Sequence, residues 1–199
     1  MKRTAPRPPA QAPQEVRIIG GRFKRSRLPV ANRPGLRPTP SRVRETLFNW
    51  LGQDLTGWRC LDAFAGTGAL GFEAASRGAA QVWLVEQDAA LVASLLSVRQ
   101  RLQAETVEVL KGDGVTQLQQ RQDLDLVFLD PPFAEGRNEA LFAAALRAAR
   151  LALKEDGFVY LEAPRPWGAD ELAPLGLQPW RQDRAGAVSF ALLRTLPAA

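Results

Sequence analysis

The 199-residue sequence contains no histidine and only one cysteine, Cys60. Without histidine, the chain cannot form a Ser-His-Asp or Cys-His catalytic site, nor a zinc site of cysteine and histidine. A single cysteine cannot form an internal disulfide, so nothing in the sequence requires an oxidising compartment. A metal site would have to consist of carboxylates alone, and we predict none.

Long apolar segments are also absent. No run approaches the roughly 20 residues that a membrane-spanning helix needs. Residues 1–14 begin with basic residues but have no apolar central stretch, so they do not form a secretory signal. We therefore expect a cytoplasmic monomer with no membrane partner. The proline- and alanine-rich residues 1–15 are expected to be a disordered arm.

Charge is present but unevenly distributed. The formal net charge is +5, yet residues 1–44 hold twelve basic residues against one acidic residue, a net +11. The remaining chain has fourteen basic and twenty acidic residues, a net −6. A solvated tail is the simplest explanation of such a run. Here, however, apolar residues alternate with the charges, and Gly20-Gly21 separates two such stretches, which predicts a small hairpin.

A hairpin of this composition would present a cationic surface to nucleic acid phosphates. Residues 16–52 are therefore predicted to form a basic RNA-binding hairpin and helix. The predicted nucleic-acid-binding residues are Arg17, Arg22, Lys24, Arg25, Arg27, Arg37 and Arg42.

Strand and helix patterns alternate through the rest of the chain. Helices are predicted at residues 42–52 (with Ser41 as N-cap), 69–77, 88–102 and 138–152. Strands are predicted at 58–63, 82–86, 107–110, 124–129 and 158–162, with two more between 177 and 196. This order predicts an α/β fold with a mostly parallel, seven-stranded, doubly wound sheet in a domain of residues 53–199. Ligands of such sheets bind at the carboxyl ends of the central strands.

A glycine-rich loop follows the first of these strands. The spacing Gly66-x-Gly68-x-x-Gly71 fits the dinucleotide fingerprint, and Glu86, 20 positions after Gly66, fits the acid that binds ribose hydroxyls. An NAD enzyme is therefore one interpretation. Asp62 favours S-adenosylmethionine instead, because a carboxylate at this strand end attracts an ammonium and a sulfonium but not a pyrophosphate.

Asp113 follows the third strand of this domain and has two interpretations. It could contact the adenine amino group of the cofactor, or it could be a turn residue between two glycines. The predicted cofactor-binding residues are Asp62, Phe64, Gly66, Gly68, Glu86 and Asp113.

The tetrapeptide Asp130-Pro131-Pro132-Phe133 follows the strand at 124–129. It could simply terminate the strand, but two prolines also restrict the backbone between Asp130 and Phe133. A fixed carboxylate and a fixed carbonyl can accept both hydrogens of a planar exocyclic amine, while Phe133 stacks on the base. These four residues are the predicted catalytic site. The chemistry needs no histidine, because a methylated amine nitrogen is acidic and loses its proton readily.

The sequence resembles the bacterial 16S rRNA guanine-N2 methyltransferases from about Val16 to the C-terminus. The resemblance rests on residues 17–21, 35–39 and 42–51, on the glycine loop, and on residues 129–133. It implies a Rossmann-like class I methyltransferase fold, S-adenosylmethionine as methyl donor, and N2 of a guanine in 16S rRNA as acceptor. The implied partner is the small ribosomal subunit or its assembly intermediate.

Two departures from the family pattern stand out. Thr67 replaces a serine that is common in the loop, and Lys24-Arg25-Ser26-Arg27 replaces a basic-Gly-basic run. Two further interpretations remain open. One is a DNA amino-methyltransferase acting on adenine or cytosine, and the other is a non-catalytic rRNA-binding assembly factor that kept the cofactor fold.

Overall fold

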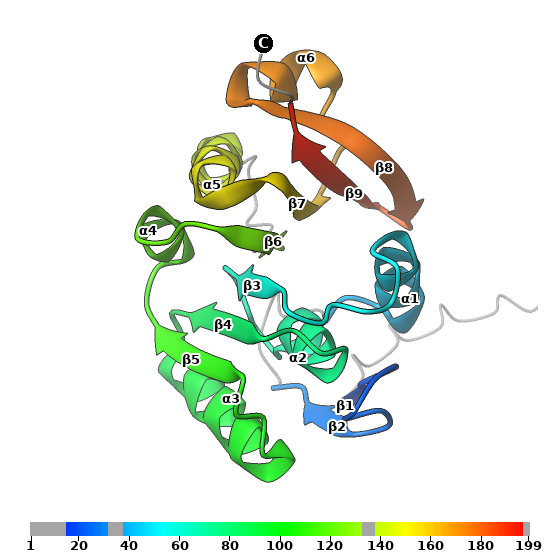
Figure 1. Ribbon diagram of the computed structural model, residues 1–199, viewed down its shortest axis with the longest axis vertical. Helices are drawn as coiled ribbons and strands as arrows, with labels where there is room; N and C mark the ends of the chain where they lie inside the picture. The colour runs from blue at the N-terminus through cyan, green and yellow to red at the C-terminus, as the bar shows by residue number, and fades with distance from the viewer. Residues whose placement is uncertain (1–14, 32–37, 133–137, 197–199) are drawn as a thin grey trace, which may run out of the picture.

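A computed structural model describes residues 15–31, 38–132 and 138–196 of the chain (Figure 1). The N-terminal part contains a two-stranded hairpin and a helix, and the rest contains a seven-stranded sheet with its helices. The elements are β1 (Glu15–Arg17), β2 (Arg27–Pro29), α1 (Ser41–Trp50), β3 (Arg59–Asp62), α2 (Ala69–Ser76), β4 (Gln81–Glu86), α3 (Ala89–Leu102), β5 (Val107–Lys111), α4 (Gly114–Gln119), β6 (Leu124–Leu129), α5 (Glu139–Ala152), β7 (Leu153–Ala163), α6 (Ala169–Leu172), the 3₁₀ turn Ala173–Leu175, β8 (Leu177–Ala185) and β9 (Val188–Thr195).

The strand order of the large sheet is β5-β4-β3-β6-β7-β9-β8. The first five of these strands run parallel, while β9 is antiparallel to both β7 and β8. The predicted fold class is therefore confirmed. The chain winds outward from β3 to β5 and then returns to β6 on the other side of β3. The order reverses at the carboxyl ends of β3 and β6, which is the place where open α/β sheets bind ligands.

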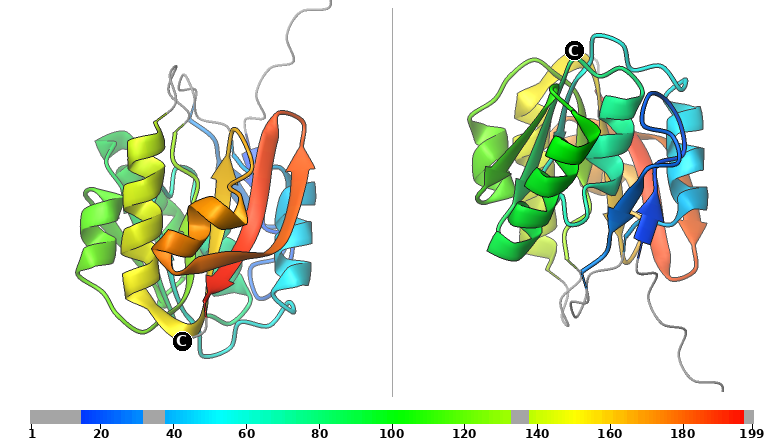
Figure 2. Two further views of the ribbon diagram at one scale, coloured as in Figure 1. Left: turned by 90° about the horizontal axis from the view of Figure 1, so that it is seen from above. Right: turned by 90° about the horizontal axis from the view of Figure 1, so that it is seen from below.

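Helices cover both faces of the sheet (Figures 1 and 2). Helices α1, α2 and α3, together with the β1–β2 hairpin, share one apolar core with Phe72, Phe128 and Tyr160. Helices α4, α5 and α6 pack on the other face around Leu129 and Leu146. No helix among the described residues is long and apolar enough to cross a membrane.

The predicted N-terminal hairpin is present. Its strands pair antiparallel from Glu15–Pro29 to Arg17–Arg27. Its apolar side chains are buried and its basic ones are exposed, as expected for a hairpin that is anchored on one face. The buried members are Val16, Ile18, Phe23 and Leu28.

Several boundaries differ from prediction. Ser41 is the first residue of α1 rather than its N-cap, because Pro40 takes the extended N-cap conformation and its carbonyl accepts the first helical hydrogen bond. Glu15 belongs to β1, whereas it was predicted in the arm. Strand β7 begins at Leu153, immediately after α5, whereas the predicted strand began at Phe158. The first half of β7 was not predicted because its Lys-Glu-Asp-Gly segment is polar and lacks a strand pattern. Helices α4 and α6 were not predicted.

Candidate active site

Four carboxylates lie along the carboxyl edge of the parallel strands. Asp62 and Glu86 end β3 and β4, Asp113 follows β5 closely, and Asp130 follows β6. In the sheet Asp62 pairs with Phe128, so Asp130 lies two residues further along the neighbouring strand. The structure thus gathers the four predicted acidic residues on one rim at the reversal of strand order.

The glycine loop between β3 and α2 is held by these carboxylates. The Gly66 N–H donates to Glu86 Oε2 at 2.9 Å, and the Gly71 N–H donates to Asp62 Oδ2 at 3.2 Å. Gly68 occupies the N-cap position of α2 with a φ of 76°, a conformation that favours glycine. A Cβ there would lie 2.6 Å from the Phe72 ring, so glycine is required by packing as well. Phe64, also in this loop, is partly exposed.

Asp62 is buried, with 2% of its surface exposed. Its Oδ1 has no hydrogen-bond partner and is the one such buried side-chain atom found in the described part of the chain. Burial raises the pKa of Asp62 to about 7, against the opposing effect of the Gly71 and Phe64 backbone N–H groups. A buried acceptor without a donor is stabilised by a cationic donor. The residue therefore fits the ammonium group of the expected cofactor.

Glu86 has two roles in this geometry. Its Oε1 accepts the backbone N–H groups of Gln87 and Asp88, while its Oε2 accepts Gly66. These bonds fix the carboxylate and leave acceptor capacity on Oε2, since each carboxylate oxygen has two lone pairs. The half-exposed side chain can therefore accept a ribose hydroxyl while it holds the loop.

Asp113 caps α4, the short helix that the sequence analysis missed. Its Oδ1 accepts both the backbone N–H and the hydroxyl of Thr116, at 2.8 and 2.9 Å. Its Oδ2 accepts the side-chain amide of Gln87 at 3.0 Å, which joins the ends of β4 and β5. The predicted turn residue is thus an N-cap, and an adenine contact would have to use the remaining acceptor capacity of Oδ2.

The Asp130-Pro131-Pro132 segment leaves the sheet directly after β6. Pro131 is buried and Pro132 is exposed, while Phe133 lies outside the described residues. Burial raises the pKa of Asp130 well above its usual range, and the neighbouring Glu162 and Asp62 charges raise it further. A donor group entering the site would stabilise the charged carboxylate and lower this pKa again.

Glu162, a buried carboxylate beside Asp130, was not among the predicted site residues. Leu129 pairs with Leu161 in neighbouring parallel strands, so Asp130 and Glu162 occupy the next adjacent positions. Glu162 is 5% exposed and its Oε1 accepts the Tyr160 hydroxyl at 2.8 Å. Like Asp62 and Glu86, Glu162 lies near the carboxyl end of an apolar strand, and that position was the available signal.

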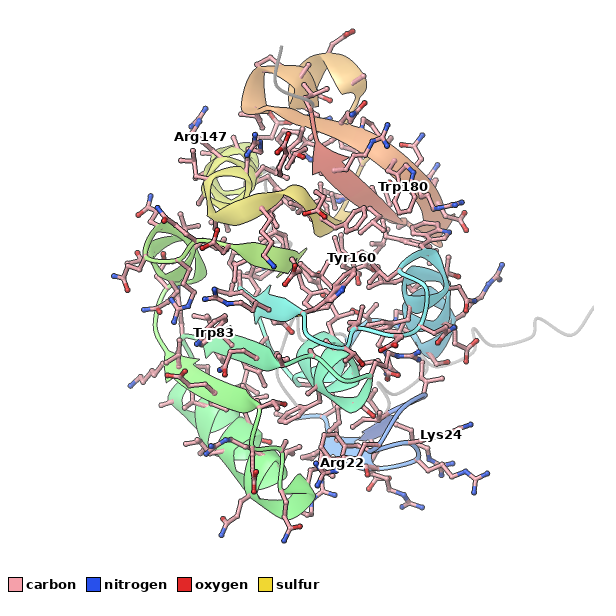
Figure 3. The ribbon with its side chains drawn as sticks, in the orientation of Figure 1. Arg22, Lys24, Trp83, Arg147, Tyr160 and Trp180 are labelled. Atoms are coloured by element: carbon pink, nitrogen blue, oxygen red, sulfur yellow. The ribbon has the colours of Figure 1, made fainter. Side chains whose placement is uncertain are left out.

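The predicted nucleic-acid-binding residues are mostly exposed. Six of them lie on the hairpin or on α1, and Figure 3 shows Lys24 pointing away from the body, while the Arg22 guanidinium lies over the Phe23 ring. Arg27 forms an exposed ion pair with Glu15 at 3.1 Å, which reduces its free charge. Arg37 lies outside the described residues. The six exposed residues are Arg17, Arg22, Lys24, Arg25, Arg27 and Arg42.

A buried ionic cluster fastens the hairpin to the helix that carries the glycine loop. Glu73 of α2 is fully buried and pairs with Arg44 at 3.2 Å and Arg77 at 2.9 Å. Its two oxygens also accept the backbone N–H groups of Ile19 and Gly20, each at 2.8 Å. The Arg44 guanidinium donates in addition to the carbonyls of Thr39 and Arg17. Arg44, unlike the six exposed residues named above, is therefore a structural residue with 1% exposure.

Comparison with known proteins identifies relatives over nearly the whole chain. The family described as "Conserved hypothetical protein 95" matches residues 16–194. A relative from Escherichia coli (strain K12), named "Ribosomal RNA small subunit methyltransferase D", is 38% identical over 179 residues, which is 89% of each chain. A protein of the same name from Haemophilus influenzae is 43% identical over 156 residues, covering 76% of this chain and 80% of its own.

The fold comparison agrees with the sequence comparison. A solved structure from Escherichia coli is 32% identical, has a TM-score of 0.79, and covers 92% of this chain and 99% of its own. Methyltransferase relatives do not support the NAD interpretation of the glycine loop. The chain therefore belongs to the family described as Conserved hypothetical protein 95 and is a relative of the small-subunit rRNA methyltransferases.

Proposed function

We propose that this protein transfers a methyl group from S-adenosylmethionine to the exocyclic N2 of a guanine in small-subunit rRNA. The observation that carries the proposal is the position of Asp130-Pro131-Pro132 at the reversal of strand order, beside Asp62 and its unpartnered Oδ1. The names and similarity of the relatives support rRNA methylation.

The cofactor-binding role rests on the carboxylates of the sheet edge. Asp62 Oδ1 would accept the ammonium group, Glu86 the ribose hydroxyls and Asp113 Oδ2 the adenine amino group. Gly66 and Gly68 let the loop backbone approach the ligand closely. When bound, S-adenosylmethionine supplies a methyl group on a positively charged sulfur, an electrophile that needs no further activation by the protein.

The acceptor role rests on Asp130 and the carbonyl of Pro131. These two acceptors would hold both N2 hydrogens, so that the nitrogen lone pair points toward the methyl carbon. Phe133 would stack on the guanine ring. N2 would gain the methyl carbon with loss of the sulfur leaving group and its bonding electron pair, and Asp130 or water would accept the proton that N2 then releases. Positioning of this kind can supply about 7–11 kcal/mol of the barrier.

The exposed cations of the hairpin would bind rRNA phosphates. Because the hairpin loop and α2 share the buried Glu73, this RNA-binding surface has a fixed position relative to the glycine loop at the other end of α2. A guanine inside an RNA helix must leave its stack to reach the site, which costs a few kcal/mol.

The proposal is tested by methyl transfer from labelled S-adenosylmethionine to naked rRNA, to assembled small subunits and to duplex DNA. We expect label in one or both rRNA substrates, and its loss in Asp130→Ala. Asp156→Ala, an exposed aspartate of β7, is the matched control and should keep wild-type activity.

Each alternative gives a distinct result in the same assay. Labelling of DNA but not of rRNA would identify a DNA amino-methyltransferase. Specific rRNA binding without label in any substrate would identify a non-catalytic assembly factor. Full activity in Asp130→Ala would refute the role of Asp130.

A further inference from the structure

Two carboxylates lie next to each other where the acceptor amine would bind. Asp130 and Glu162 are neighbours across the parallel β6–β7 pair, directly after the paired residues Leu129 and Leu161. They are close enough that the charge of Glu162 acts on Asp130. The proposed chemistry uses only one of them, so the role of Glu162 requires a separate explanation.

The Glu162 carboxylate is held in place from several elements. The Tyr160 hydroxyl, two residues earlier on the same face of β7, donates to Oε1 at 2.8 Å. The side chain of Thr39, just before α1, forms a second hydrogen bond with it. On the other side, β9 places Phe190 directly opposite Glu162. Figure 3 shows Tyr160 in the interior, between the sheet and α1.

No ion pair neutralises this carboxylate in the described part of the chain. The charged groups acting on the Asp130–Glu162 pair include a third carboxylate, Asp62. The cation Arg44 lies nearby, where it donates to the carbonyl of Thr39 and is already paired with Glu73. A buried carboxylate beside another is costly unless donors satisfy both. The site therefore favours a ligand that presents two adjacent N–H donors.

Guanine is the base with this arrangement. Its N1–H and its N2 amine are neighbouring donors on one edge of the ring. In adenine and cytosine, the ring nitrogen next to the amine is an acceptor, and an acceptor facing a carboxylate is repelled. Built-in mismatches of this type provide specificity between similar ligands.

We propose that Glu162 is a specificity-determining residue that accepts the N1–H of the target guanine while Asp130 holds its N2 amine. This inference rests on the proposed function and assigns the choice of base to the pair Asp130–Glu162. Tyr160 and Thr39 act as positioning residues that orient the Glu162 carboxylate.

The test uses 2-aminopurine, which keeps the amine at position 2 but has an acceptor at N1. The guanine that the wild type methylates is first mapped on natural rRNA and then replaced by 2-aminopurine in the same RNA. The measured quantity is the ratio of kcat/KM for the two RNAs. We expect the wild type to prefer guanine by about 10- to 100-fold, the range for a hydrogen bond to a charged group.

Glu162→Gln is the central variant, because its amide still accepts from Tyr160 but can donate to N1 of 2-aminopurine. The preference for guanine should fall at least about tenfold. Loss of O6 from 2-aminopurine affects both enzymes equally and cancels in this comparison. Glu155→Gln, an exposed glutamate of the same strand, is the matched control and should keep the wild-type ratio.

The outcomes separate this inference from the function on which it rests. If the wild type methylates guanine and Glu162→Gln loses activity with an unchanged ratio, Glu162 is structural and the inference is wrong. If the wild type methylates no guanine amine, the proposed function fails and the inference with it. If Glu162→Gln does not fold, Tyr160→Phe replaces it. That variant should lower the ratio about threefold or more, and an unchanged ratio there would refute the inference.

Discussion

Replacing Glu73 by alanine should destabilise the protein more than any exposed charge substitution. Glu73 accepts hydrogen bonds from the backbone of Ile19 and Gly20 and from the guanidinium groups of Arg44 and Arg77. All these donors remain in the variant, and the side chains of Arg44 and Arg77 are only 1% and 6% exposed. Burial already lowers the pKa of Arg44, with Glu73 as the first opposing influence.

The expected magnitude follows from this count of partners. Removing one partner of a buried ion pair costs about 3–5 kcal/mol, because the remaining charge is left unpaired. In a chain of this length, each kcal/mol lowers the melting temperature by about 2–4 °C. The variant should therefore melt about 6–20 °C below the wild type. Detachment of the hairpin from α2 would limit the loss to the lower part of this range.

Thermal unfolding followed by circular dichroism measures this loss, provided that unfolding is reversible. Glu45→Ala is the matched control, because Glu45 is an exposed glutamate on α1 and its removal should cost less than about 0.5 kcal/mol. Glu73→Gln retains one acceptor oxygen and should lie between the two. A Glu73→Ala melting temperature within 2 °C of the wild type, roughly a 1 kcal/mol effect or less, would refute the reasoning.

Three further predictions concern the hairpin and the cofactor site. Affinity for rRNA should fall about 10³-fold between 50 and 200 mM salt if about six phosphates are contacted. In a filter-binding titration, the double variant Arg22→Ala/Lys24→Ala should lower the slope of log affinity against log salt concentration by about 2 units. An unchanged slope would contradict this. Cofactor affinity, measured by calorimetry, should fall as the pH drops below about 7, because protonation neutralises Asp62. Asp62→Asn should bind the cofactor weakly and with little pH dependence. A wild-type affinity that does not change between pH 6 and pH 8 would contradict the proposed role of Asp62. Gly21→Ala should weaken rRNA binding and leave cofactor binding intact, because the φ of Gly21 is +71° and a Cβ there would lie 1.7 Å from the Ser76 carbonyl oxygen. Gly57→Ala is the control, because Gly57 also has a positive φ but a Cβ there would meet open space. Equal rRNA affinity of the two variants would contradict the packing argument.

The parts of the site that sequence reasoning located share one local pattern. Asp62, Glu86 and Asp130 each end or follow an apolar strand, and the topology brings parallel strand ends to one edge. Glu162 follows the same pattern, but the Ala163-Pro164-Arg165-Pro166 segment after it resembles an ordinary strand end rather than a glycine loop or a double-proline motif. Its proximity to Asp130 depends on the pairing of β6 with β7, which strand patterns alone do not specify.

Charge counting was least informative for Arg44. Arg44 was counted among the twelve basic residues of residues 1–44 but given no separate role, although it lies on the same face of α1 as Leu47 and Phe48. An arginine on the apolar face of a helix can be recognised as buried only when its acidic partner is known. That partner, Glu73, is 29 residues away and on another helix, so tertiary packing decides the role.

Helix α4 was missed because glycines flank Asp113 and glycine is a weak helix former. Asp113 nevertheless caps the helix through Thr116, and a short-range Asp-x-x-Thr spacing was the signal present. The glycines disfavour a helix here while the Asp113 cap favours one, and the capped helix forms.

The proposed function is methylation of the exocyclic amine of a guanine in small-subunit rRNA. The most direct measurement is mass spectrometry of nucleosides from rRNA treated with the wild type or with Asp130→Ala and S-adenosylmethionine. We expect N2-methylguanosine at one position with the wild type and none with the variant. Methylation of another base or another guanine atom, or equal N2-methylguanosine in both samples, would contradict it.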